Sequence, residues 1–185
     1  MIYAFLATGF EEIEAITVID VLRRAGLQVE TVSVTDDKVV LGAHSIPVIA
    51  DRMFREVTDF SAADALFLPG GLPGATNLDA HEGLRQVILN HAEVGKTLVA
   101  VCAAPLVYGH LGLTKGKKAT CYPGFETELE GAEYTATLVE QDGNLITGCG
   151  PAACLELGYT VVAHLKDKAT ADQLREGMQY NKLGV

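Results

Sequence analysis

The chain has 185 residues, of which 49% are hydrophobic, and a net charge of −10 at pH 7. This length and apolar content suit one substantial core, so we expect residues 1–185 to form a single domain. The negative charge argues against nucleic acid or an anionic membrane as a partner, because both attract basic surfaces. No apolar run approaches the roughly 20 residues of a membrane helix.

Four cysteines are scattered without a Cys-x-x-Cys pair or a nearby histidine: Cys102, Cys121, Cys149 and Cys154. This spacing does not favour a structural zinc site, and a disulfide framework is not typical of an α/β chain of this size. The apolar N-terminal segment has no basic leader, which indicates a buried strand rather than a secretory signal. We therefore expect a cytoplasmic protein with free thiols and no bound metal.

Short apolar strands alternate with amphipathic helical segments, a pattern typical of βαβ units and a mostly parallel sheet. The predicted core strands are residues 2–7, 28–34, 65–68 and 97–102. The predicted helices are residues 11–26, 83–94, 103–111, 152–165 and 169–180. Two hairpins are expected, at residues 39–49 and around Asp142-Gly143. Residues 119–136 follow no clear pattern.

Glu14 interrupts the apolar face of the first predicted helix. At a period of 3.6 residues that face collects Ala15, Val18, Ile19, Val21, Leu22 and Ala25, and the polar face collects Glu12, Thr17, Asp20, Arg23 and Arg24. A carboxylate is rarely buried without a partner, because desolvation of its charge is costly. Burial should raise the pKa of Glu14, with repulsion from a neighbouring thiolate as a second cause. The alternative is that Glu14 complements the helix dipole, as Glu11 and Glu12 do.

Cys102 stands at the corner between a predicted strand and a predicted helix, which is the position of a nucleophile elbow. Small residues flank it two positions away on each side, Ala100 and Ala104, where a G-x-S-x-G elbow has glycines. Pro105 suits the first turn of the helix. A thiol at a helix N-terminus is expected to have a lowered pKa. The alternative is a buried cysteine that only fills core space.

Two glycines follow the third core strand, within Pro69-Gly70-Gly71. Their backbone can approach a ligand closely and present N–H groups, as an oxyanion hole requires, and the N–H of Ala103 would add to them. A plain tight turn is the alternative. Dinucleotide binding is disfavoured, because the chain has no G-x-G-x-x-G motif and its first loop region carries three glutamates that would repel phosphate. We expect no flavin, nicotinamide or other cofactor.

Four motifs resemble the ThiJ/PfpI superfamily, closest to its branch of the Parkinson-disease protein and bacterial YajL: Gly9-Phe10-Glu11-Glu12-Ile13-Glu14, Leu68-Pro69-Gly70-Gly71, Ala100-Val101-Cys102-Ala103-Ala104-Pro105 and Gly150-Pro151. The resemblance implies a flavodoxin-like, three-layer α/β sandwich that forms a homodimer, with Cys102 as the functional thiol. It also implies that Glu14 is the family's protonated glutamate and that Gly71 and Ala103 supply the backbone donors. The residues then expected around the substrate are Gly70, Tyr122, Gly150 and Pro151.

Two positions depart from the family pattern. Many members have a histidine near the active cysteine where this chain has Tyr122, and several have an arginine where it has Cys149. None of the chain's five histidines lies in the loops that follow the first, third and fourth core strands, where Glu11, Gly70 and Cys102 lie. His110 is too far along its helix to reach the thiol. A cysteine–histidine dyad for acyl transfer is therefore not evident. The missing histidine also weakens glyoxalase chemistry, although YajL-type members lack it too.

The resemblance implies protection from oxidative and carbonyl stress, with several mechanisms left open. The thiolate of Cys102 would convert small aldehydes such as methylglyoxal without a cofactor, as a glyoxalase or deglycase, or it would sense peroxide by forming a sulfinate. A redox-regulated chaperone without turnover is the alternative. An older association of the family name with thiamine biosynthesis is a further alternative. A purely structural or small-molecule-binding module would leave Glu14 unexplained.

Overall fold

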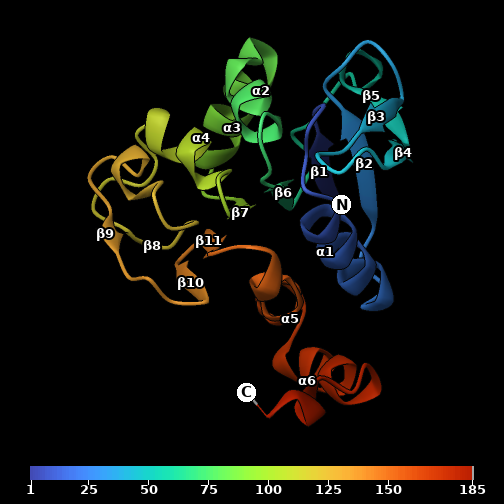
Figure 1. Ribbon diagram of the computed structural model, residues 1–185, viewed down its shortest axis with the longest axis vertical. Helices are drawn as coiled ribbons and strands as arrows, with labels where there is room; N and C mark the ends of the chain where they lie inside the picture. The colour runs from blue at the N-terminus through green and yellow to red at the C-terminus, as the bar shows by residue number, and fades with distance from the viewer. Residues whose placement is uncertain (185) are drawn as a thin grey trace.

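The computed structural model describes residues 1–184, and its centre is a sheet of seven strands (Figure 1). The strand order is β10-β11-β7-β6-β1-β2-β5, and every neighbouring pair is parallel except β10 with β11. The strands of this sheet are β1 Ile2–Leu6, β2 Val29–Ser33, β5 Arg52–Met53, β6 Ala65–Leu68, β7 Thr97–Val101, β10 Val139–Asp142 and β11 Leu145–Gly148. Two small sheets lie apart from it and pair β3 Val39–Leu41 with β4 Pro47–Ile49, and β8 Lys118–Ala119 with β9 Glu133–Tyr134.

Side chains of the central strands alternate between two apolar cores, one on each face of the sheet. In β1, Ile2, Ala4 and Leu6 belong to one core, and Tyr3 and Phe5 belong to the other. Both faces are therefore buried, which is why these strands are continuous apolar runs in the sequence rather than alternating ones.

Helices cover both faces of the sheet and give the molecule three layers (Figure 1). The helices are α1 Glu12–Arg24, α2 Gly74–Ala80, α3 Glu82–Glu93, α4 Pro105–His110, α5 Cys154–Leu165 and α6 Lys168–Gly177. α1 and α5 pack in the core that contains Ile2, and α2, α3 and α4 pack in the core that contains Tyr3. Gly158 of α5 allows α1 to come close, because a Cβ there would lie 2.8 Å from Cγ1 of Val21. No helix within residues 1–184 is long and apolar enough to cross a bilayer.

The structure confirms the predicted α/β fold with its mostly parallel central sheet, and each helix and core strand expected from the sequence is present. Among the elements that were not expected are α2 and β5. α2 has only seven residues and follows a loop rich in proline and glycine, so its sequence shows no helical period. The unassigned residues 119–136 contain a 3-10 helix at Glu126–Glu128 and the β9 strand.

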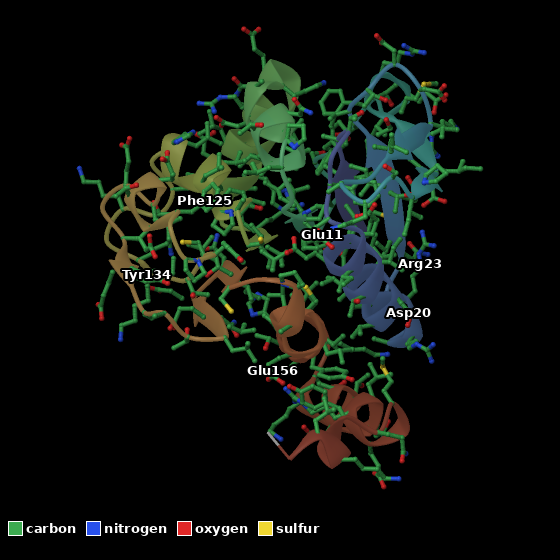
Figure 2. The ribbon with its side chains drawn as sticks, in the orientation of Figure 1. Glu11, Asp20, Arg23, Phe125, Tyr134 and Glu156 are labelled. Atoms are coloured by element: carbon green, nitrogen blue, oxygen red, sulfur yellow. The ribbon has the colours of Figure 1, made fainter. Side chains whose placement is uncertain are left out.

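The carboxyl ends of β1, β6 and β7 lie side by side, because these parallel strands are neighbours in the sheet. The loops that leave these ends are tied together by main-chain bonds. The N–H of Glu11 donates to the carbonyl of Gly70 at 2.9 Å, and the N–H of Gly74 donates to the carbonyl of Gly9 at 3.1 Å. Glu11, at the start of α1, accordingly lies near the middle of the molecule, with Asp20 and Arg23 further out along the helix (Figure 2).

Candidate active site

Cys102 directly follows β7 and has a φ of 62°, in the left-handed region. A residue other than glycine costs roughly 1–2 kcal/mol in this backbone conformation, so the surrounding structure has to hold Cys102 there. The N–H of Cys102 donates to the carbonyl of Gly148 at 2.9 Å, and its carbonyl accepts from the N–H of Tyr122 at 2.8 Å. The N–H of Ala104 closes the turn onto the carbonyl of Val101 at 3.0 Å. The corner predicted from the sequence is therefore a strained elbow that its neighbours fix from both sides.

Glu14 is fully buried on α1, as its place among the apolar residues of that helix predicts. Its Oε2 accepts the backbone N–H of Gly70 at 2.8 Å. Its Oε1 has no hydrogen-bond partner within residues 1–184. The carboxyl lies close enough to the thiol of Cys102 for that side chain to lower the pKa of Glu14. One oxygen of the acid is thus held by the glycine loop, and the carboxyl as a whole is adjacent to the thiol.

Gly70 allows the acid and the thiol to lie close together, because any larger residue at this position would collide with both of them. A Cβ at this position would lie 2.7 Å from the Cβ of Cys102 and 2.7 Å from Oε2 of Glu14. Gly71 is equally constrained, with a φ of 83° and a hypothetical Cβ only 2.5 Å from the nitrogen of Glu11. The two glycines therefore serve close packing around the pair, which a plain surface turn would not require.

Two backbone amides approach the sulfur of Cys102. The backbone N–H groups of Gly71 and Ala103 lie near it, and both lower the pKa of the thiol. They come from different loops, after β6 and after β7, so the folded sheet is needed to bring them together. Donors in this arrangement can stabilise an anion that forms at or beside the sulfur.

Burial dominates the electrostatics of the pair. Burial raises the pKa of Glu14 from its ordinary value to about 7. Hydrogen bonds from Cys102 and Gly70 lower this pKa, and the charge of Glu11 raises it further. Burial, together with the charge and the hydrogen bond of Glu14, raises the pKa of Cys102 to about 12. Between these two pH values the pair holds a single proton, which can reside on the carboxyl or on the sulfur.

Two electrostatic predictions require correction. The like charge that raises the pKa of Glu14 comes from Glu11 and not from the thiolate. The expected lowering of the pKa of Cys102 by a helix N-terminus is wrong for the state in which Glu14 is ionised, because burial and the adjacent carboxylate outweigh the amides. α4 spans only Pro105–His110, so its dipole is small. A thiolate at neutral pH requires that Glu14 keep the proton.

Other predicted site residues lie at the rim. Tyr122 is bonded to the elbow through its N–H and is 47% exposed. A Cβ on Gly150 would lie 3.3 Å from the Tyr122 ring, so the two residues are adjacent. Pro151 starts the short 3-10 helix that leads into α5. The thiol of Cys154 is buried and donates to the carbonyl of Gly150 at 3.6 Å.

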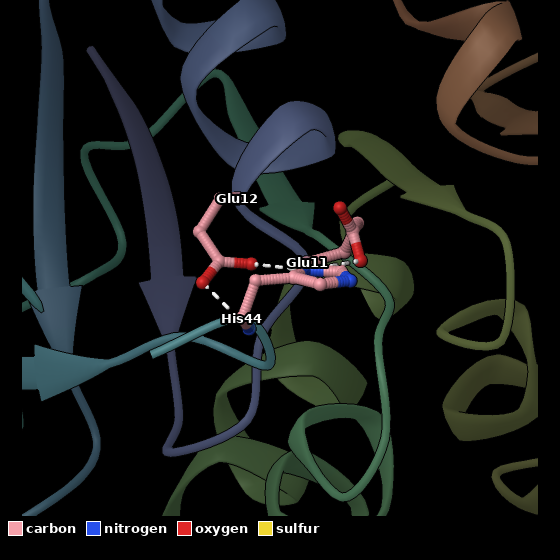
Figure 3. Close-up of side chains that lie close together, drawn as sticks. All are labelled: Glu11, Glu12 and His44. Atoms are coloured by element: carbon pink, nitrogen blue, oxygen red, sulfur yellow. Dashed lines mark hydrogen bonds and ion pairs between the residues drawn. The ribbon is translucent and has the colours of Figure 1, made fainter. Parts of the chain in front are cut away.

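Glu12 and His44 form a contact that no pattern in the sequence predicts. Glu12 was assigned to the polar face of α1, but it is buried because the turn between β3 and β4 folds over it. Its Oε1 accepts the N–H of His44 at 2.8 Å, and its Oε2 lies 3.0 Å from Nδ1 of His44 (Figure 3). The two residues are 32 positions apart, and no motif in the sequence links them.

The DJ-1/PfpI family model matches residues 1–164 of the chain. Protein DJ-1 homolog B of Arabidopsis thaliana is 39% identical over 168 residues, which are 90% of this chain but only 38% of that protein. A Schizosaccharomyces pombe protein named glutathione-independent glyoxalase DJ-1 is 29% identical and is covered to 93%. Among solved structures, oxidized DJ-1 of Toxoplasma gondii has a TM-score of 0.92 at 30% identity, with 96% of this chain and 97% of that chain covered.

The parallel sheet and the strained cysteine define a flavodoxin-like α/β protein with a nucleophile elbow. The match over residues 1–164 then shows the family: the chain belongs to the DJ-1/PfpI family. This membership confirms the resemblance inferred from the four sequence motifs. The chain spans less than half the length of the Arabidopsis relatives, so activities of those whole proteins are not transferred to it.

We predict that Glu14→Gln changes how stability depends on pH. A carboxyl whose pKa is raised by folding, here from 4.5 to about 7, stabilises the protein fully below pH 4.5 and loses that contribution as the pH rises through about 7. Between pH 4.5 and about pH 8, the free energy of unfolding of the wild type should therefore fall by up to about 3 kcal/mol more than that of Glu14→Gln. Urea unfolding at the two pH values measures this difference.

The surface substitution Glu93→Gln controls for the loss of one negative charge, since Glu93 lies exposed at the end of α3. If the free energy of unfolding depends on pH equally in Glu14→Gln and in the wild type, the raised pKa assigned to Glu14 is contradicted.

Proposed function

We propose that this protein is a cofactor-independent glyoxalase that converts small reactive carbonyls such as methylglyoxal and uses Cys102 as its nucleophile. The observation that carries the proposal is the strained elbow, where a fully buried acid and two backbone N–H groups lie beside the thiol of a partly exposed cysteine. Strain of this kind persists where the surrounding structure enforces it, typically at functional sites. The name of the S. pombe relative supports the same reaction.

In the first step the thiolate of Cys102 adds to the aldehyde carbon of methylglyoxal. The carbon–sulfur bond forms and the carbonyl π bond breaks, so negative charge develops on the oxygen. The N–H groups of Gly71 and Ala103 are placed to stabilise this charge, and the proton of Glu14 can neutralise it to give a hemithioacetal. An acid kept protonated by burial is suited to this transfer at neutral pH.

In the second step the carboxylate of Glu14 removes the hydrogen of the former aldehyde carbon as a proton and returns a proton to the neighbouring carbon, while the hydroxyl proton of the first carbon passes to the carbonyl oxygen of the second. This transfer oxidises the first carbon and reduces the second, so no external redox cofactor is needed. The product is a thioester of Cys102, and hydrolysis by one water releases lactate and the free thiol. Glu14 is the acid and base throughout, which compensates for the absence of a histidine beside Cys102.

Peroxide sensing is a second candidate function, which the exposure of the four cysteines favours. Cys102 and Cys149 are partly exposed, whereas Cys121 and Cys154 are buried. Of the two partly exposed thiols, Cys102 has Glu14 and the two amides beside it. Two successive peroxide molecules would each transfer one oxygen to the sulfur and leave as water, which gives a sulfinate that the same donors can hold. A redox-regulated chaperone without turnover would begin with this modification.

We also propose a homodimer formed through α1 and the β3–β4 hairpin. Large apolar side chains are exposed on both elements: Ile13, Ile16, Val39, Leu41, Ile46 and Ile49. The hairpin is fixed to the start of α1, since the N–H of Ala43 donates to the carbonyl of Phe10 at 2.8 Å. Exposed apolar surface of this extent is typical of a protein–protein contact, and a twofold axis would pair it with itself. We assign the protein to the cytoplasm, where its thiols stay reduced.

We predict that the purified protein forms lactate from methylglyoxal without glutathione and that Cys102→Ser forms none. Glu14→Gln should lower kcat by about 100- to 10,000-fold, the usual contribution of a general acid and base. Cys149→Ser is the matched control and should keep the wild-type rate. Equal turnover by Cys102→Ser and the wild type, measured by enzymatic assay of lactate, would overturn the glyoxalase mechanism.

Limited peroxide treatment should add two oxygen atoms to Cys102 before any other cysteine reacts, because the other thiols lack the acid and the two amides. Peptide mass spectrometry after treatment identifies the modified residue, and Cys102→Ser should show no early product. Preferential oxidation of Cys121 or Cys149 would count against the sensing role.

A further inference from the structure

A second cluster of ionisable side chains lies where the turn between β3 and β4 crosses the start of α1 (Figure 3). It consists of Glu11, Glu12 and His44. One ligand atom from each residue, two carboxylate oxygens and one imidazole nitrogen, lies within 4.8 Å of the others. Nδ1 of His44 is 3.0 Å from Oε2 of Glu12 and 3.4 Å from Oε2 of Glu11.

The cluster contains more negative charge than its own residues neutralise. Nδ1 of His44 carries at most one hydrogen, yet it faces two carboxylates. Glu12 also accepts the N–H groups of His44 and Ile46, at 2.8 and 3.3 Å. Glu11 is only 9% exposed, and within residues 1–184 its carboxylate contacts no basic group except His44. A carboxylate withdrawn from water in this way is stabilised by a positive charge beside it.

His110 provides the contrast, because it also stands between two carboxylates. Its Nδ1 pairs with Asp79 and its Nε2 pairs with Glu128, each at 2.8 Å. The carboxylates lie on opposite sides of the ring, so one ion cannot contact all three groups, and each nitrogen has its own partner. At His44 both carboxylates converge on the same nitrogen.

We propose that Glu11, Glu12 and His44 bind a divalent first-row metal ion. An imidazole and two carboxylates are donors that such ions accept. Ligand atoms at about 2.1 Å from an ion are roughly 3.0–3.4 Å apart, a spacing that Nδ1 already has to both carboxylates. The two glutamates are held by the fold, whereas the His44 side chain is 68% exposed in the single chain and can adjust its position to the ion.

The site is separate from the proposed catalytic groups, since neither Cys102 nor Glu14 is a ligand. Failure of metal binding would leave the glyoxalase proposal intact, and loss of activity in Cys102→Ser would say nothing about the ion.

Calorimetric titration of the metal-free protein with Co²⁺ tests the proposal, with the visible absorption of the ion as a second readout. We expect one ion per chain, and we expect Glu11→Gln and His44→Ala each to weaken binding at least 10-fold. His110→Ala is the matched control, because it removes a histidine flanked by two carboxylates that cannot share an ion, and it should bind Co²⁺ as the wild type does. Circular dichroism verifies that each variant is folded.

Wild-type affinity in both Glu11→Gln and His44→Ala would overturn the proposal, as would the absence of binding at millimolar Co²⁺. Loss of binding in Cys102→Ser, or an intense near-ultraviolet band from a cobalt–thiolate bond, would show that the ion binds a cysteine instead and would overturn it equally.

Discussion

The site depends on one proton that Glu14 and Cys102 share. Both groups are largely removed from water, so neither ionises without cost, and the charge of one opposes the charge of the other. The surroundings decide where the proton stays. Two backbone N–H groups lie near the sulfur and one donates to the carboxylate, and Cys102 is partly exposed whereas Glu14 is fully buried. Both proposed reactions require the state in which Glu14 is protonated beside a thiolate, which the backbone N–H groups near the sulfur favour and burial of the thiol opposes.

The rest of the fold keeps this pair at a fixed distance. Gly70 permits the contact because any side chain would collide with both partners, and the bonds from Gly148 and Tyr122 hold the elbow in its left-handed conformation. These contacts come from the loop after β6, from β11 and from the segment after β8, which are apart in the sequence. A site of this kind therefore exists only once the parallel sheet has assembled.

Much of this arrangement could be predicted from local sequence patterns. Continuous apolar runs predicted the buried strands, and an acid on the apolar face of a helix predicted the burial of Glu14. The pKa of Cys102 could not be predicted, because it depends on how deeply neighbouring elements bury the elbow. The pairing of Glu12 with His44 was missed for a similar reason, since it arises where a hairpin turn folds over a distant helix. α2 was missed because seven residues are too few for a helical period.

The rate of Cys102 alkylation as a function of pH, followed by peptide mass spectrometry in the wild type and in Glu14→Leu, tests the shared proton most directly. If Glu14 keeps the proton, the wild-type rate rises with a midpoint near the pKa of the pair, about 7, and the midpoint moves upward in Glu14→Leu, which can neither donate to the sulfur nor take its proton. If the sulfur keeps the proton, the wild-type rate stays low until the pH approaches about 12, and the account is contradicted.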